Sequence, residues 1–169
     1  MLKPSRVIVS SLVLLMTTVS AQAQIESVGG QLLECQTLWE GTGELDMQLA
    51  TISREEFDED GEEGTVYNFS AQGIRAFGFY PKSLRLDEYE DKHGYNKEYT
   101  AVIDADYSSL LAAVFLATGK SKCENVPVNA SEQSCRIHLR NETSLNKDVD
   151  INVAERSGTV RLECLYQAI

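Results

Sequence analysis

Residues 148–166 read DVDINVAERSGTVRLECLY, and this stretch decides the fold class. Apolar side chains alternate with polar ones over 149–154 and again over 159–166. Such a period of two indicates strands with one face on a core and one face in water. Ser157-Gly158 lies between the two runs as a turn signal, so the stretch predicts an antiparallel hairpin.

The same pattern continues towards the N-terminus. Short apolar or alternating runs bounded by turn residues predict seven further strands, over 31–39, 44–52, 65–69, 73–80, 83–87, 98–104 and 134–141. No Pro- or Ser-rich linker divides them. We therefore expect residues 24–169 to form one mainly β (α+β) domain, either an antiparallel β-sandwich or a partly closed barrel.

One segment breaks the period of two and predicts the single helix of the domain. Asp106 or Ser108 can cap a helix that runs from Leu110 to Leu116, and Gly119 can end it. The segment is apolar nearly all round. We therefore expect a short helix that is buried against a sheet.

Residues 1–23 have the features of a cleaved secretory signal peptide. Two basic residues precede an apolar run over 7–16, and Ala21-Gln22-Ala23 forms a small-x-small cleavage site. The run is shorter than the roughly 20 residues that a membrane span needs. The short signal with its Ala-x-Ala end is typical of bacterial export, so we expect a periplasmic or secreted protein that begins at Gln24.

Charge restricts the class of partner. The 15 basic and 26 acidic residues give a net charge of −11. Residues 24–169 keep 13 of the basic residues and all of the acids, which gives −13. No Lys/Arg cluster offers the basic surface that a nucleic-acid binder needs. We expect a protein partner, and the charge favours a cationic one.

Four cysteines in an exported chain predict two disulfides and no free thiol. A zinc site is not favoured, because no CxxC occurs and neither histidine is close to a cysteine in the sequence. Cys35 and Cys164 both fall on the inward face of predicted strands, at the two ends of the domain. We therefore pair Cys35 with Cys164 and Cys123 with Cys135, among the three pairings that four cysteines allow.

The densest charge lies over 55–63, where only two residues of EEFDEDGEE are uncharged. It does not form a helix–loop–helix calcium loop, because Tyr67 stands where that loop needs a glutamate. Three interpretations stay open: a solvated hairpin tip, a docking surface for a cationic partner, and a weak calcium site. The candidate residues for docking or calcium are Glu56, Asp58, Asp60 and Glu62.

The clearest basic face on this acidic chain consists of Arg136, His138 and Arg140, which share the outward phase of one predicted strand. These three residues are a candidate anion-binding site, and a solvated sheet face is the alternative. The other histidine, His93, lies in a polar turn and has no partner for metal binding or acid–base catalysis at useful spacing.

Aromatic side chains suggest a surface for a protein partner. Phe77 and Phe79 share one face of a predicted strand. Tyrosines cluster among acidic residues in the strands and turns that follow, a composition that is common at the rim of an interface: Tyr80, Tyr89, Tyr95 and Tyr99. The alternative is that the rings line or cover the core.

The sequence assigns no catalytic residue, cofactor or metal, because GxSxG, HExxH and P-loop motifs are missing. We therefore expect a non-catalytic periplasmic or secreted binding protein, for example an inhibitor or immunity factor for a cationic hydrolase. One alternative is a small exported hydrolase that uses His93 with a carboxylate, which leaves open whether the protein is an enzyme. Another is a structural envelope-assembly component with an exposed strand edge.

The cleavage site predicts that exported protein begins at Gln24. The intact mass of protein recovered from the periplasm or medium measures this directly. A mass that retains any part of residues 1–23 would contradict the assigned cleavage site.

Overall fold

The computed structural model describes residues 28–168, apart from 60–61, 93, 125–131 and 143–146. Within these residues, seven strands form one antiparallel sheet in the order β1-β2-β3-β4-β7-β6-β5. The strands are β1 (Thr51–Glu59), β2 (Glu62–Phe69), β3 (Pro81–Asp91), β4 (Gly94–Ile103), β5 (Glu132–Glu142), β6 (Lys147–Arg156) and β7 (Thr159–Ala168). The mainly β class is confirmed, and the sheet is open: β1 and β5 are its two edges.

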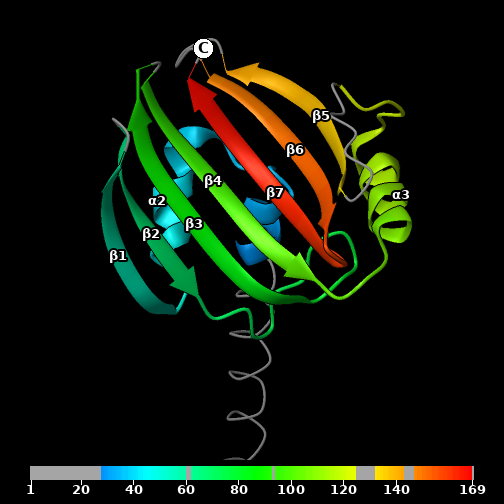
Figure 1. Cartoon of the computed structure of the whole chain (residues 1–169), viewed down its shortest axis with the longest axis horizontal. Helices are drawn as coiled ribbons and strands as arrows, with labels where there is room; N and C mark the ends of the chain where they lie inside the picture. Colours follow the sequence, from blue (N-terminus) through cyan, green and yellow to red (C-terminus); the bar gives the residue numbers. More distant parts are fainter. Residues whose placement is uncertain (1–27, 60–61, 93, 125–131, 143–146, 169) are drawn as a thin grey trace, which may run out of the picture.

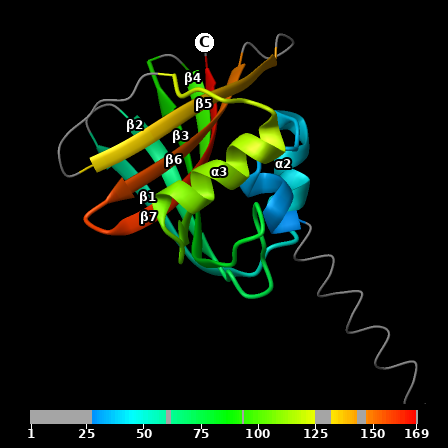
Figure 2. The same ribbon diagram turned by 90° about the vertical axis from the view of Figure 1, so that its right-hand side faces the viewer.

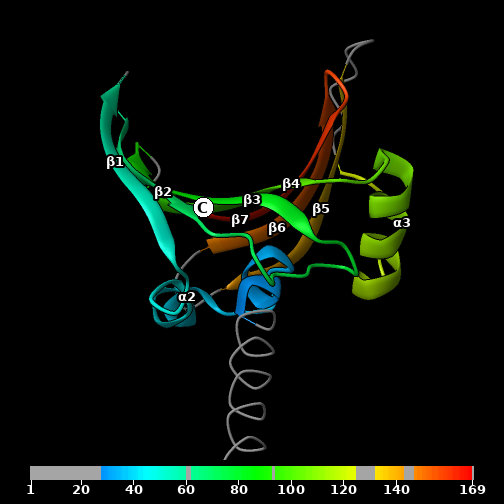
Figure 3. The ribbon, with the colours of Figure 1, turned by 90° about the horizontal axis from the view of Figure 1, so that it is seen from below.

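The sheet is strongly curved and forms a trough (Figures 1 and 3). A short helix over 28–33 and α2 (Trp39–Asp46) lie beneath the trough. Helix α3 (Tyr107–Thr118) lies outside it, across β5 and β6 (Figure 2). The helices therefore cover the outer face of the sheet and leave the inner face of the trough open.

Alternation along the strands separates these two faces. The outer face carries the core, whose sheet residues are Leu84, Leu86, Tyr99, Ala101, Ile103, Cys135, Ile137, Val149, Ile151, Val153, Val160, Leu162, Cys164 and Tyr166. Because each of these side chains is almost fully removed from water, the core is the main source of stability. The intervening residues point into the trough and are mostly polar.

The prediction of strands over 31–39 and 44–52 is wrong: residues 31–33 and 39–46 are helical, and only 51–52 belong to a strand. Val28, Leu32 and Leu33 are buried against the sheet. Gly29 and Gly30 allow this close packing: a Cβ on either would lie 2.6 Å from Ile74 or from the Arg75 carbonyl. An open sheet needs a cover for its apolar face, and that tertiary requirement overrides the local strand pattern.

Both predicted disulfides are confirmed, Cys35–Cys164 and Cys123–Cys135. The strand phase assumed for Cys35 is wrong, however. Cys35 lies in the turn after the first helix and has a positive φ of 53°. Its sulfur still reaches Cys164 because the helical segment lies directly under β7.

Hydrogen bonds strengthen this attachment of the N-terminal segment. Arg140 donates from its guanidinium to the carbonyls of Cys35 and Thr37, at 2.7 Å each. The hydroxyl of Tyr166 donates to the Thr37 carbonyl at 2.5 Å. The backbone N–H of Trp39 donates to Glu142 at 3.0 Å. The start of α2 is thus fixed to β5 and β7.

One further segment differs from the sequence prediction. Residues 73–80 form no strand but a tight turn in which Ala76 and Phe79 pair around Phe77 and Gly78, both with positive φ. The acidic segment over 55–63 forms the facing ends of β1 and β2, where Glu59 lies opposite Glu62. Six predicted strands agree with β2 to β7 within a few residues: 65–69, 83–87, 98–104, 134–141, 149–154 and 159–166.

Helix α3 begins and ends where the sequence predicts. Asp106 accepts a hydrogen bond from Ser109 N at 2.9 Å, and Gly119 ends the helix with a φ of 69°. It is less buried than its apolar sequence suggests. Leu110 and Val114 pack on the core, whereas Leu116 is 87% exposed.

The lengths of the two closed loops predict which disulfide contributes more to the free energy of unfolding. Cys35–Cys164 closes 129 residues and Cys123–Cys135 closes 12, which corresponds to about 5 and about 3 kcal/mol in the loop-entropy relation. We expect a Cys35→Ala/Cys164→Ala variant to lose more unfolding free energy than Cys123→Ala/Cys135→Ala. Urea denaturation of both variants measures this, and the reverse order would contradict it.

Candidate functional site

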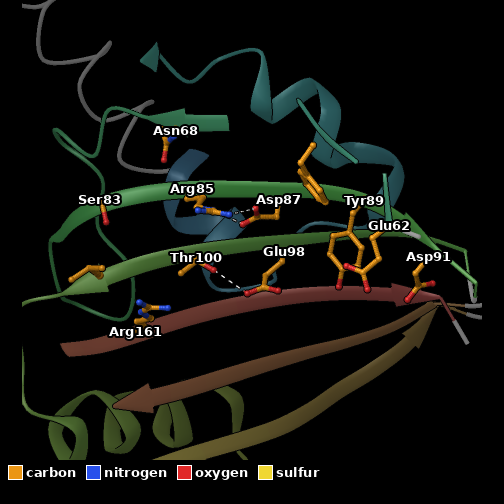
Figure 4. A pocket seen from close by; sticks show the side chains of 12 residues that line it. Glu62, Asn68, Ser83, Arg85, Asp87, Tyr89, Asp91, Glu98, Thr100 and Arg161 are labelled. Carbon is orange, nitrogen blue, oxygen red and sulfur yellow. Dashed lines mark hydrogen bonds and ion pairs between the residues drawn. The ribbon is translucent and has the colours of Figure 1, made fainter. Parts of the chain in front are cut away.

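The open face of the trough is a polar hollow of about 600 Å³ (Figure 4). Arg85 donates two hydrogen bonds to Asp87, at 2.7 and 2.5 Å, and Thr100 donates to Glu98 at 3.1 Å. Burial raises the pKa of the Glu98 carboxyl, and the negative charge of Glu163 raises it further. The floor of the trough is therefore a network of side chains that mostly bond one another.

The predicted basic face over Arg136, His138 and Arg140 is divided by the structure. A bulge between His138 and Arg140 turns Arg140 to the outer face, where it holds the N-terminal segment. Arg136 and His138 stay in the trough, and both bond Asp150. Anion binding by these residues remains a prediction. Arg136 and His138 stay side by side, but both already bond the Asp150 carboxylate.

The acidic candidates are also divided. Glu56 and Asp58 lie on the outer face of β1, whereas Glu62 lines the trough. Asp60 and His93 lie outside the described residues. The pairing of the strands places two acids that were not predicted, Glu63 and Glu90, beside the predicted ones. Glu63 lies opposite Asp58 on one side and opposite Glu90 on the other.

We call Glu56, Asp58, Glu63 and Glu90 the acidic ladder. Glu56 has an exposed ion pair with Arg54 at 2.9 Å. Within the described chain no cation pairs with Asp58, Glu63 or Glu90. The ladder borders a hollow of about 560 Å³ that also holds Tyr95, whose side chain is 43% exposed.

Next to the ladder lies a partly buried charge cluster of Asp46, Glu88 and Lys97. Lys97 Nζ donates to Glu88 Oε1 at 2.5 Å and to Asp46 Oδ2 at 3.3 Å. Tyr99 also donates to Asp46 Oδ2, at 3.1 Å. The cluster connects the last residue of α2 to β3 and β4.

The two ends of this ion pair respond differently to burial. Burial would lower the pKa of Lys97, but the hydrogen bond that Lys97 donates to Glu88 and the charge of Asp46 outweigh it, so the net shift is upward. The pKa of Asp46 is raised, because burial outweighs the attraction of the one lysine that it shares with Glu88. The environment therefore favours the charged form of Lys97, whereas burial disfavours the charged form of Asp46.

A cavity of about 290 Å³ opens beside the cluster, between the end of α2 and strands β1 to β3. Tyr67, Phe69 and Leu86 line it, and Gly43 and Met47 of the α2 end also border it. A glycine inside a helix costs about 1 kcal/mol relative to alanine. A Cβ on Gly43 would meet no atom within 4 Å, so close packing does not explain this glycine.

No sequence pattern identified Asp46, Glu88 or Lys97 as candidate site residues. One signal could have found them: Lys97 has the same strand phase as Tyr99, Ala101 and Ile103, all of which face the core. A lysine on the inward phase of a strand needs a buried acidic partner. Its partner Asp46 comes from a helix that the strand pattern did not predict.

The described residues contain no helix that is long and apolar enough to cross a membrane. They contain no group of three His, Cys, Asp or Glu side chains that could hold a metal ion.

In comparisons with known proteins, no family model, curated protein or solved structure matched this chain.

The Asp150–His138 pair predicts a pH dependence of stability. The hydrogen bond that His138 donates to the Asp150 carboxylate raises the pKa of His138 above its ordinary 6.5. The resulting stability is fully present below that ordinary value and is lost as pH rises through the raised value. We expect His138→Gln to lose more unfolding free energy at about pH 5 than at about pH 8.

Urea denaturation of wild type and His138→Gln at both pH values measures the effect. NMR titration of Asp150→Asn gives the control, because the pKa of His138 should fall back towards its ordinary value. An equal loss at both pH values would contradict the pairing.

Proposed function

We propose that the protein is a non-catalytic, periplasmic or secreted binding protein that docks a cationic protein partner on the acidic ladder. The observation that carries this proposal is the row of like charges Asp58–Glu63–Glu90 on three neighbouring strands. Like charges directly opposite one another destabilise a sheet, by up to about 1 kcal/mol per pair. A partner that brings Lys or Arg side chains to the row would remove this repulsion.

The neighbourhood of the ladder supports docking. Tyr95 borders the same hollow as Glu90, and its ring packs edge-on against Trp39 at 5.9 Å. A half-exposed aromatic ring on a fixed support is a frequent anchor in protein interfaces. The high negative charge of the whole chain would speed the encounter with a basic protein and contribute to specificity. A cationic hydrolase is the partner class that we favour.

The two alternatives have less support. An envelope-assembly role through strand addition would use an open edge, but four of the nine residues of the β1 edge are acidic. Charged side chains on an edge oppose pairing with a further strand. A hydrolase that uses His93 would need a carboxylate beside this histidine. His93 lies outside the described residues, so no observation supports such a pair.

Reversal of the ladder tests the proposal. A partner is first captured on the full-length protein at low salt from the envelope and medium of the source organism. We expect Glu56→Lys/Asp58→Lys/Glu63→Lys/Glu90→Lys to slow its association at least tenfold and to change thermal stability little. The association rate of the wild type should fall as salt rises.

The matched control reverses four acids away from the ladder, Glu40, Glu44, Glu124 and Glu155, with the same change in net charge. It should slow association less than the ladder variant does. Equal association of wild type and ladder variant would contradict docking on the ladder. If calcium raises the melting temperature of wild type and not of the ladder variant, the ladder is a calcium site instead.

A further inference from the structure

The cavity at the end of α2 combines an apolar wall with a charged floor. Tyr67 and Phe69 stack with ring centroids 6.2 Å apart, and Leu86 is fully buried behind them. Asp46 and Glu88 form the charged side of the same cavity, with Lys97 between them. A ligand that fits needs an apolar body and one polar end.

The charge at that end is not balanced. Two carboxylates share one lysine ammonium, which leaves one negative charge. Asp46 Oδ1 is buried and has no hydrogen-bond partner among the described residues. Helix α2 ends at Asp46 and has no basic residue in its last turn. The negative end of the helix dipole therefore adds to the preference for a cation.

The helix leaves the mouth of the cavity open. Gly43 borders the cavity from inside α2, where a glycine weakens the helix relative to alanine and where a Cβ would meet nothing. Met47, on the same border, is 81% exposed. A glycine at this position is explained if a ligand passes beside it.

We propose that this cavity binds a primary ammonium at the end of an alkyl chain, the chemistry of a lysine side chain or of a free alkylamine. The alkyl stem packs against Tyr67, Phe69 and Leu86. The ammonium donates to Glu88 and to the carboxylate of Asp46, which both border the cavity. Arg54 already lies over the Tyr67 ring, 5.7 Å from its centroid, so this ring contributes apolar contact.

The position of the cavity suggests which source supplies the ammonium. Glu88 lies opposite Thr65, and Thr65 opposite Glu56 of the acidic ladder. Glu88 also borders the hollow of the ladder. A partner docked on the ladder could therefore place one lysine in the cavity. This assignment to a lysine of the partner rests on the proposed function, whereas the ammonium site itself does not.

Calorimetry with the full-length protein tests the site. The probes are N-acetyl-lysine methylamide and n-butylamine, and their neutral isosteres are N-acetyl-norleucine methylamide and n-butanol. We expect at least tenfold weaker binding of each isostere. The ¹³C signal of the Met47 methyl group, assigned with Met47→Leu, should shift only with the amines. Equal binding of amine and isostere would overturn the proposal.

Three variants locate the site. Glu88→Gln should weaken amine binding at least tenfold, whereas Glu90→Gln, two residues further along the same strand face, should leave it unchanged. Gly43→Leu fills the mouth, keeps every charge and favours the helix, so it should fold and still lose binding. Gly43→Ala is its control and should bind nearly as wild type does. Full binding by Gly43→Leu would overturn the assignment to this cavity.

Competition distinguishes the sources and separates this proposal from the proposed function. If the captured partner displaces N-acetyl-lysine methylamide, a lysine of the partner fills the cavity; if it does not, the ligand is a free amine. If no amine binds while ladder reversal still slows association, only the ammonium site is wrong. If amines bind while ladder reversal has no effect, only docking on the ladder is wrong.

Discussion

The attachment of the N-terminal segment to the outer face of the sheet is the constraint on which the rest of the structure depends. A single open sheet with one apolar face cannot bury that face by itself. The helix over 28–33 and α2 supply the cover, and Cys35–Cys164 fixes them beneath β7. Arg140 adds two hydrogen bonds to the carbonyls that follow the first helix. Without this attachment the core would face water.

The same attachment positions the features that we assign to binding. Because the start of α2 is held at Trp39, its last residue, Asp46, reaches Lys97 on β4. That contact closes one side of the cavity and leaves Glu88 between cavity and ladder. The trough, on the other face, is occupied by its own hydrogen bonds, such as those between Arg85 and Asp87. Asp58, Glu63 and Glu90, which pair with no cation among the described residues, lie together on the outer face at the β1–β3 end.

Sequence patterns predicted the sheet well and the binding surfaces poorly, for a physical reason. Alternation is a local property, so the strands over 149–166 and the cap at Asp106 could be identified directly. The cover depends on distant contacts: Leu33 and Cys35 alternate as in a strand but lie in and after a helix. Arg140 shares its sequence phase with Arg136, yet one bulge moves it to the other face. Asp46 and Lys97 meet across 51 residues, a separation at which no sequence pattern links them.

Docking of a cationic partner on the acidic ladder, as proposed above, can be mapped without any substitution by hydrogen–deuterium exchange of the full-length protein, free and with its captured partner. We expect slower exchange over the facing segments of β1, β2 and β3 around Asp58, Glu63 and Glu90, and at Tyr95. Protection confined to β5 to β7 and the trough residues Glu98 and Arg161 would contradict it.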